Sequence, residues 1–261
     1  MTSGQIHRLE RISYTDLIPL IALRPIVLLP WGSAEAHGPH LPLGTDGIIS
    51  REVTRRAAVR LANEDGCCVI IAPSVDYGVT NFGAAFPGTL SVSDSTVSSL
   101  VDEICRSLGK HGLSRTCIVN NHLEPAHIAA LKLGASRAAA SGCVVWVPDN
   151  TERRWATTLG DEFRSGACHA GRYETSLVLA AEPHTDVLTR AARLSPNPAS
   201  LSRAIRLGAR TFEEAQGPDA YFGWPADATV EEGDALYSAL VEMVVQTIRE
   251  SGISTPDFSR V

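Results

Sequence analysis

Two short segments each place a carboxylate and an imidazole two residues apart, directly after a hydrophobic run of strand length. Glu35 and His37 follow the run PIVLLP, and His122 and Glu124 follow the run RTCIVN. Side chains two residues apart on extended backbone point to the same side, so each pair can offer nitrogen and oxygen to one ligand. Asp46 closes the loop that begins at Glu35 and supplies a third carboxylate.

Two imidazoles and three carboxylates suit Zn²⁺, Mn²⁺ or Fe²⁺. A single catalytic zinc usually takes three protein ligands, so five ligands fit two divalent ions that share one carboxylate. A hydroxide held between two such ions predicts hydrolysis, because the ions lower the pKa of water and polarise a carbonyl. Taken alone, Asp46 would be a helix N-cap and His122 an ordinary strand-end histidine. Their arrangement at two strand ends favours the metal site.

A third segment, SGACHAGRYETS, contributes His169 and Glu174 where helical patterning begins. Imidazole suits proton transfer near neutral pH, so His169 is the predicted proton donor to a leaving nitrogen. Glu174 falls in the first helical turn, where it is either an additional ligand or a side chain that orients one. The alternative is a capping loop with a hydrogen-bonded histidine. The long loop 74–93 is expected to form a wall of the substrate site.

Strand-like runs alternate with helical patterns along most of the chain. The strands are expected at 25–30, 67–73, 115–120 and 142–148, and the helices near 47–63, 93–110, 125–140, 173–182, 201–216 and 231–250. Continuous hydrophobic strands that alternate with helices indicate a mostly parallel sheet covered on both faces. We therefore expect a single three-layer α/β/α domain over residues 1–261, with ligands bound beyond the carboxyl ends of the strands.

The composition narrows the function further. The chain has 261 residues, of which 44% are hydrophobic and 20% charged, and its net charge of −6 argues against a nucleic-acid-binding protein. No run is long enough to cross a membrane, and the N-terminus lacks the apolar core of a signal peptide. Six cysteines without paired spacing are expected to be reduced thiols, and a cytoplasmic location is expected.

Several motifs together resemble the creatininase family of metal-dependent amidohydrolases. They are EAHGPHLP (35–42), TD (45–46), FPGT (86–89), NNH (120–122), HAG (169–171) and ETS (174–176). The resemblance implies a creatininase-like fold and a pair of divalent ions, Zn, Mn or Fe. It implies two ligand sets that share a bridging aspartate, namely Glu35, Asp46 and His122, and His37, Asp46 and Glu124. His169 matches the proposed proton donor, and Glu174 matches a glutamate that serves as ligand in members lacking the one at position 124.

Departures from creatininase itself concern the substrate. Leu123, Ser165 and Cys168 stand where creatininase carries a tyrosine, a tryptophan and an acidic residue, so the resemblance implies a small or cyclic amide other than creatinine. Members that trim a peptide, as in mycofactocin maturation, or cleave a formamide give an alternative activity. A non-catalytic metal-containing binding protein is a further alternative. The resemblance also implies a homo-oligomer, commonly a hexamer.

Overall fold

A five-stranded, wholly parallel sheet forms the centre of the computed structural model, which describes residues 4–183 and 186–252. The strands are β1 (Gln5–Arg8), β2 (Ile26–Trp31), β3 (Cys68–Ile71), β4 (Arg115–Asn120) and β5 (Val144–Trp146). They lie in the order β1-β3-β2-β4-β5, so β2 and β4 are direct neighbours at the middle of the sheet.

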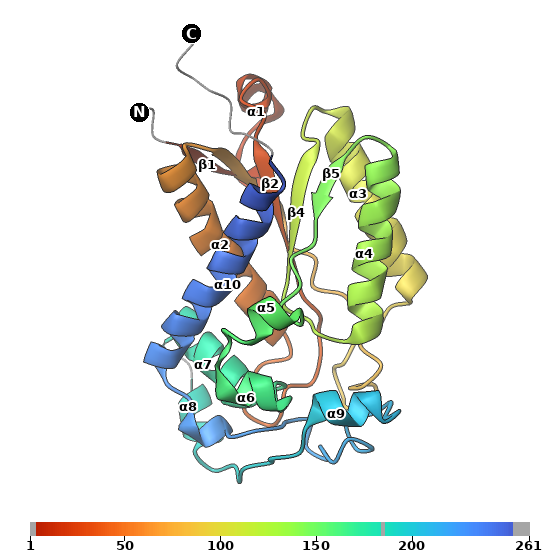
Figure 1. The fold of residues 1–261 in the computed structure, drawn as a ribbon, viewed down its shortest axis with the longest axis vertical. Coiled ribbons are helices and arrows are strands. Elements are labelled where there is room, and N and C mark those ends of the chain that lie inside the picture. Colours follow the sequence, from red (N-terminus) through yellow and green to blue (C-terminus); the bar gives the residue numbers. More distant parts are fainter. Residues whose placement is uncertain (1–3, 184–185, 253–261) are drawn as a thin grey trace.

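Helices cover both faces of this sheet (Figure 1). The longer ones are α1 (Tyr14–Ile21), α2 (Thr45–Asp65), α3 (Asp94–Lys110), α4 (Pro125–Ala140), α7 (Arg172–Ala181) and α10 (Val230–Glu250). The short ones are α5 (Arg153–Ala156), α6 (Gly160–Ser165), α8 (Val187–Ala191) and α9 (Leu201–Arg206). Helices α2, α7 and α10 lie on one side of the sheet, while α3 and α4 lie on the other.

Alternation along the central strands explains the two hydrophobic cores. Ile26 and Leu28 of β2 pack into the cluster formed with α2, α7 and α10. Val27 and Leu29 point to the opposite face and pack with α3 and α4. All six residues of β2 are buried, which is why the strand reads as a continuous hydrophobic run rather than an alternating one. The expected three-layer α/β/α arrangement is confirmed.

The expected strands and most of the expected helices are present, with small differences at their ends. The prediction of one helix is wrong. The pattern at 201–216 predicts a single helix, whereas α9 ends at Arg206. Gly208 has a φ of +100°, a left-handed conformation that ends the helix, and the chain then folds back so that Phe212 is buried. The short strand β1 and helices α1, α5, α6 and α8 were not predicted.

All six cysteines are free and five of them are buried, as expected of reduced thiols. No helix in the described part of the chain combines the length and apolar character needed to cross a bilayer. Residues 1–3, 184–185 and 253–261 of the predicted domain lie outside the described residues.

Helices α7 and α10 meet at Gly233, and this contact positions the helix that carries Glu174. A Cβ on Gly233 would collide with the backbone oxygen of Ser176. We predict that Gly233→Ala lowers the free energy of unfolding by about 1–3 kcal/mol, the usual cost of overpacking. Urea denaturation measures this, and Ser238→Ala, on the exposed side of the same helix, serves as the control. Equal stability of the two variants would show that α7 and α10 separate at little cost.

Candidate metal centre

The predicted ligand pairs meet because their strands are neighbours. Strands β2 and β4 are parallel and paired in register, with Trp31 opposite Asn120 at their carboxyl ends. The loop after β2 carries Glu35 and His37, and the turn after β4 carries His122. Helix α2 starts close to the end of β2, because Gly32 leaves room for the backbone of residues 46 and 47.

The protonation of His122 can be assigned from its neighbours. Its Nε2 lies 2.7 Å from the carbonyl oxygen of Val79, which can only accept a hydrogen bond, so Nε2 carries the proton. In the neutral form of the ring, which is the form that binds a metal, the Nδ1 atom therefore presents a lone pair. It lies 3.0 Å from Asp46 Oδ2 and 3.3 Å from Glu35 Oε2. One imidazole lone pair and two carboxylate oxygens thus converge in a buried space.

His37 repeats this arrangement with its other nitrogen. Nδ1 lies 3.0 Å from the carbonyl oxygen of Glu35 and therefore donates to it. Nε2 faces Asp46 Oδ1 at 3.1 Å and Glu174 Oε2 at 3.6 Å, and in the neutral form of the ring it offers a lone pair there. The two imidazoles thus present opposite ring nitrogens to the same carboxylate.

Asp46 lies between the two imidazoles and gives one oxygen to each. Its side chain is buried, and Oδ2 accepts no hydrogen bond within the described structure. Buried acceptors that face only lone pairs require a cation, either a proton or a metal ion, to balance their charge. Asp46 is not the N-cap of α2, because that position is Gly44. The donor set fits two divalent ions that share Asp46.

Two three-residue groups around Asp46 have ligand atoms within 4.8 Å of one another. They are Glu35, Asp46 and His122, and His37, Asp46 and Glu174. The first matches the set implied by the family resemblance. The second contains Glu174, the alternative candidate ligand, where the resemblance implies Glu124. The Glu174 carboxylate lies 3.6 Å from His37 Nε2 and accepts a hydrogen bond from Ala170 N–H at 2.6 Å.

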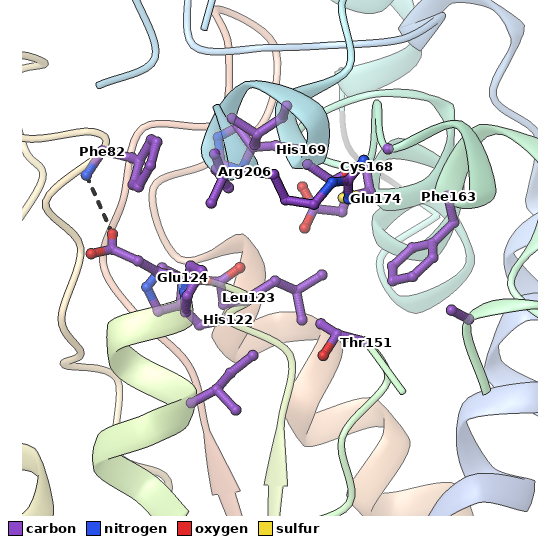
Figure 2. A pocket seen from close by; sticks show the side chains of 18 of the residues that line it. Phe82, His122, Leu123, Glu124, Thr151, Phe163, Cys168, His169, Glu174 and Arg206 are labelled. Carbon is purple, nitrogen blue, oxygen red and sulfur yellow. Dashed lines mark hydrogen bonds and ion pairs between the residues drawn. The ribbon is translucent and has the colours of Figure 1, made fainter. Parts of the chain in front are cut away.

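Glu124 lies at the edge of the cluster rather than within it. Its Oε2 accepts a hydrogen bond from the backbone N–H of Phe82 at 3.3 Å, on the side of the pocket away from Glu174 (Figure 2). It belongs to none of the three-residue ligand groups among residues 4–183 and 186–252. The predicted role of Glu124 as a ligand or catalytic group therefore stays a prediction.

Burial and opposite charge set the pKa values of the cluster in the absence of metal. Burial disfavours the cation of His37, but the carboxylates of Asp46 and Glu174 outweigh it and raise its pKa to about 10. Burial raises the pKa of Glu174 to about 8, despite the opposing effect of His37. Burial also opposes ionisation of Asp46, yet the two nearby imidazoles bring its pKa below the usual range. Without metal, therefore, protons occupy this site.

His169 lies beside the cluster in the predicted position. Its Nε2 is 3.0 Å from the carbonyl oxygen of Ala36 and therefore donates to it, which leaves Nδ1 free to accept a proton. The ring lies 4.4 Å from that of His37 and stacks on Phe212 at the same centroid distance. Burial, assisted by the charge of His37, lowers the pKa of His169 to about 4. His169 is therefore neutral at pH 7.

Several supporting residues were not found from the sequence. His127 accepts a hydrogen bond from Val79 N–H at 3.3 Å, and its ring lies 4.8 Å from that of His122. The buried Glu162 accepts hydrogen bonds at 2.8 Å from the backbone N–H groups of Tyr173 and Trp224. Glu162 thereby connects the start of α7 with the loop that contains Trp224. The sequence gives no signal for these roles, because each depends on contacts between segments far apart in the chain.

His40, from the first motif, lies outside the metal cluster. Its Nε2 is 2.9 Å from the hydroxyl oxygen of Thr175, so it links the loop after β2 to helix α7. Burial lowers its pKa to about 4, which keeps the ring neutral. His40 therefore helps to hold Glu174 beside the two imidazoles.

A pocket of about 790 Å³ opens over the cluster. Its floor includes Glu35, Asp46 and His122, and its walls come from loop 74–93 and from the segments that carry α4, α5, α6 and α9. Phe82 is the residue of loop 74–93 that lines it (Figure 2), and the predicted role of this loop in substrate binding stays a prediction. The cluster is thus accessible from this cavity.

Known proteins that are similar to this chain in sequence or in structure all point to the creatininase family or its fold. The profile of the family described as creatininase, creatinine amidohydrolase, matches residues 10–248. The mycofactocin precursor peptide peptidase of Mycobacterium tuberculosis H37Rv is 32% identical over 232 residues, covering 86% of this chain and 84% of that protein. The creatinine amidohydrolase of Pseudomonas putida is 31% identical over 104 residues, or 38% of each chain. A solved structure described as "Creatininase Mn" has a TM-score of 0.74 at 24% identity, covering 95% of this chain and 98% of that one.

The fold and the clustered imidazole and carboxylate ligands define a metal-binding hydrolase with a parallel α/β/α architecture. The match of the family profile over most of the chain goes further, and the protein belongs to the creatininase family.

Metal binding must displace protons from this site. In the metal-free protein the pKa of His37 is raised to about 10 and that of Glu174 to about 8, so this pair holds protons at neutral pH that a metal ion must displace. We therefore predict that the apparent Kd for Mn²⁺ falls by about tenfold or more per pH unit between pH 6 and 8. Titration calorimetry in buffers of different ionisation enthalpy would also detect proton release. A Kd independent of pH would contradict the assigned protonation.

Proposed function

We propose that the protein hydrolyses an amide C–N bond with two divalent metal ions held around Asp46. The observation that carries this proposal is the position of Asp46, whose two oxygens each face a ring nitrogen of a different imidazole. Glu35 and His122 would complete one ion's ligand set, and His37 and Glu174 the other. When bound, such ions lower the pKa of water and polarise a carbonyl oxygen.

His169 would carry the proton in this reaction. Its neutral ring has a free Nδ1, which can accept a proton from the attacking water and then donate it to the departing nitrogen. Stacking on Phe212 and the hydrogen bond to the Ala36 carbonyl fix the plane and tautomer of the ring. A ring held in this way needs little reorganisation during proton transfer.

The cavity supports a substrate larger than a small ring. Its volume of about 790 Å³ lies in the upper part of the range found for pockets that hold drug-sized ligands. The relative from Mycobacterium tuberculosis, named as a precursor peptide peptidase, matches along most of its length, which supports a short peptide as substrate. A small or cyclic amide is the second candidate, supported by the creatinine amidohydrolase of Pseudomonas putida.

The pocket lining argues against creatinine itself. Leu123 and Cys168 line the cavity, at positions where the family resemblance implies a tyrosine and an acidic residue in creatininase. Neither side chain offers a strong hydrogen-bonding group at neutral pH, since burial raises the pKa of the Cys168 thiol to about 12. These residues suit apolar contact better than recognition of a small polar ring.

Removal of the metal should abolish turnover. Treatment with a chelator, or the variant His122→Ala, is expected to lower kcat/KM for the best amide substrate about a thousandfold, the effect of losing several kcal/mol of transition-state stabilisation. Added Mn²⁺ or Zn²⁺ should restore the activity of the chelator-treated wild type but not that of the variant. His111→Ala, at an exposed histidine outside the pocket, is the control. Full activity after verified metal removal would exclude the proposed chemistry.

The role of His169 separates an enzyme from a non-catalytic binding protein. We predict that His169→Ala retains its metal, measured by elemental analysis, while kcat falls about 100- to 10,000-fold, the usual contribution of a general acid–base group. A binding protein would show no turnover in either form. Unchanged kcat in the variant would assign the proton transfer to another group.

A further inference from the structure

Charge is distributed unevenly over the pocket described above. Three of the acidic residues that line it, Glu35, Asp46 and Glu174, belong to the metal cluster, and the fourth, Glu124, lies at the edge of this cluster. The basic residues that line it come from the walls, namely Lys132, Arg153, Arg164 and Arg206. The pocket therefore carries guanidinium groups as well as carboxylates, although the chain as a whole has a net charge of −6. All three arginines that line the pocket lie on the short helices α5, α6 and α9, and none of them belongs to the metal cluster.

Only one of these four cations is neutralised by a neighbour in the described structure. Lys132 Nζ lies 2.6 Å from Asp149 Oδ2. Among residues 4–183 and 186–252, the ion pairs include none for Arg153, Arg164 or Arg206. These arginines therefore remain available to bind an anion in the pocket.

Two of these arginines lie on short helices that are joined by hydrogen bonds. Arg164 is in the last turn of α6, and Arg206 is the last residue of α9. Between these helices, Ser200 Oγ donates to the carbonyl oxygen of Ser165 at 2.7 Å, and Ser202 N–H donates to that of Gly166 at 3.2 Å. Figure 2 shows Arg206 on the side of the pocket that carries His169 and Cys168. The two helices thus present both arginines to the same cavity.

We propose that Arg164 and Arg206 bind a carboxylate of the substrate, and that the substrate is a short peptide cut near its free C-terminus. This inference rests on the proposed amide hydrolysis. A guanidinium group offers a planar fork of donors that matches a carboxylate, and charge-assisted hydrogen bonds of this kind are stronger than neutral ones. Apolar residues beside the arginines, including Phe163, Leu201 and Ile205, would contact the side chains of the peptide.

Two sets of peptides test this assignment by binding rather than by turnover. N-acetylated tripeptides of mixed sequence are prepared once as free acids and once as C-terminal carboxamides. Each set is equilibrated with manganese-loaded His169→Ala protein, which keeps the peptides intact, and the bound fraction is measured by mass spectrometry. We expect the free acids to be bound about tenfold more tightly, the effect of one charge-assisted hydrogen-bonded pair.

The arginine variants are then compared in the same assay. Arg206→Gln and Arg164→Gln should each reduce the affinity for free acids about tenfold and leave the affinity for carboxamides unchanged. Arg203→Gln, an exposed arginine on the same helix that does not line the pocket, should change neither. Higher salt should weaken only the binding of the free acids. Equal binding of acids and carboxamides, or no binding of either set, would overturn the proposal.

Turnover by the wild type separates this proposal from the proposed function. If free acids bind through Arg206 but no peptide is cleaved, the carboxylate site stands and peptide hydrolysis is wrong. If both sets are cleaved equally and Arg206→Gln has no selective effect, amide hydrolysis stands and the carboxylate site is wrong.

Discussion

The site depends on a buried carboxylate placed between two imidazole lone pairs. Asp46 gives one oxygen to His122 and the other to His37, and backbone carbonyls hold the protons of both rings on the opposite nitrogens. A buried anion surrounded by other electron pairs is stable only with compensating positive charge. Burial of this group therefore requires either protons or metal ions, and the ligand types fit divalent metals.

Three separate parts of the chain keep these groups in place. Pairing of β2 with β4 brings the two strand-end motifs together, and the close approach at Gly32 brings in the first turn of α2. Helix α7 adds the third part, and its start is held by Glu162 and by the hydrogen bond between His40 and Thr175. Metal ligands that are oriented by such outer contacts keep their geometry when a substrate binds.

Under the proposed function, the floor of the pocket would carry out the reaction and its walls would bind the substrate. Its floor carries the ligand cluster, whereas its walls carry apolar side chains and arginines on the short helices between β5 and α10. Rigid strand ends suit a reaction centre, since the same geometry must be kept in every turnover. Short helices and loops can change without disturbing the sheet, which explains how one family fold accommodates substrates as different as a ring and a peptide.

The sequence by itself determined the parallel sheet, the motifs at its carboxyl edge, and the candidates Glu35, His37, Asp46 and His122. Buried strands read as hydrophobic runs, and polar residues after such runs are a local signal. It did not determine β1, whose polar residues show no alternation, or the end of α9 before Gly208. Only the tertiary structure placed Glu174 beside His37 and turned Glu124 toward Phe82, because that choice depends on where α7 packs, and no local pattern encodes the packing of segments so far apart.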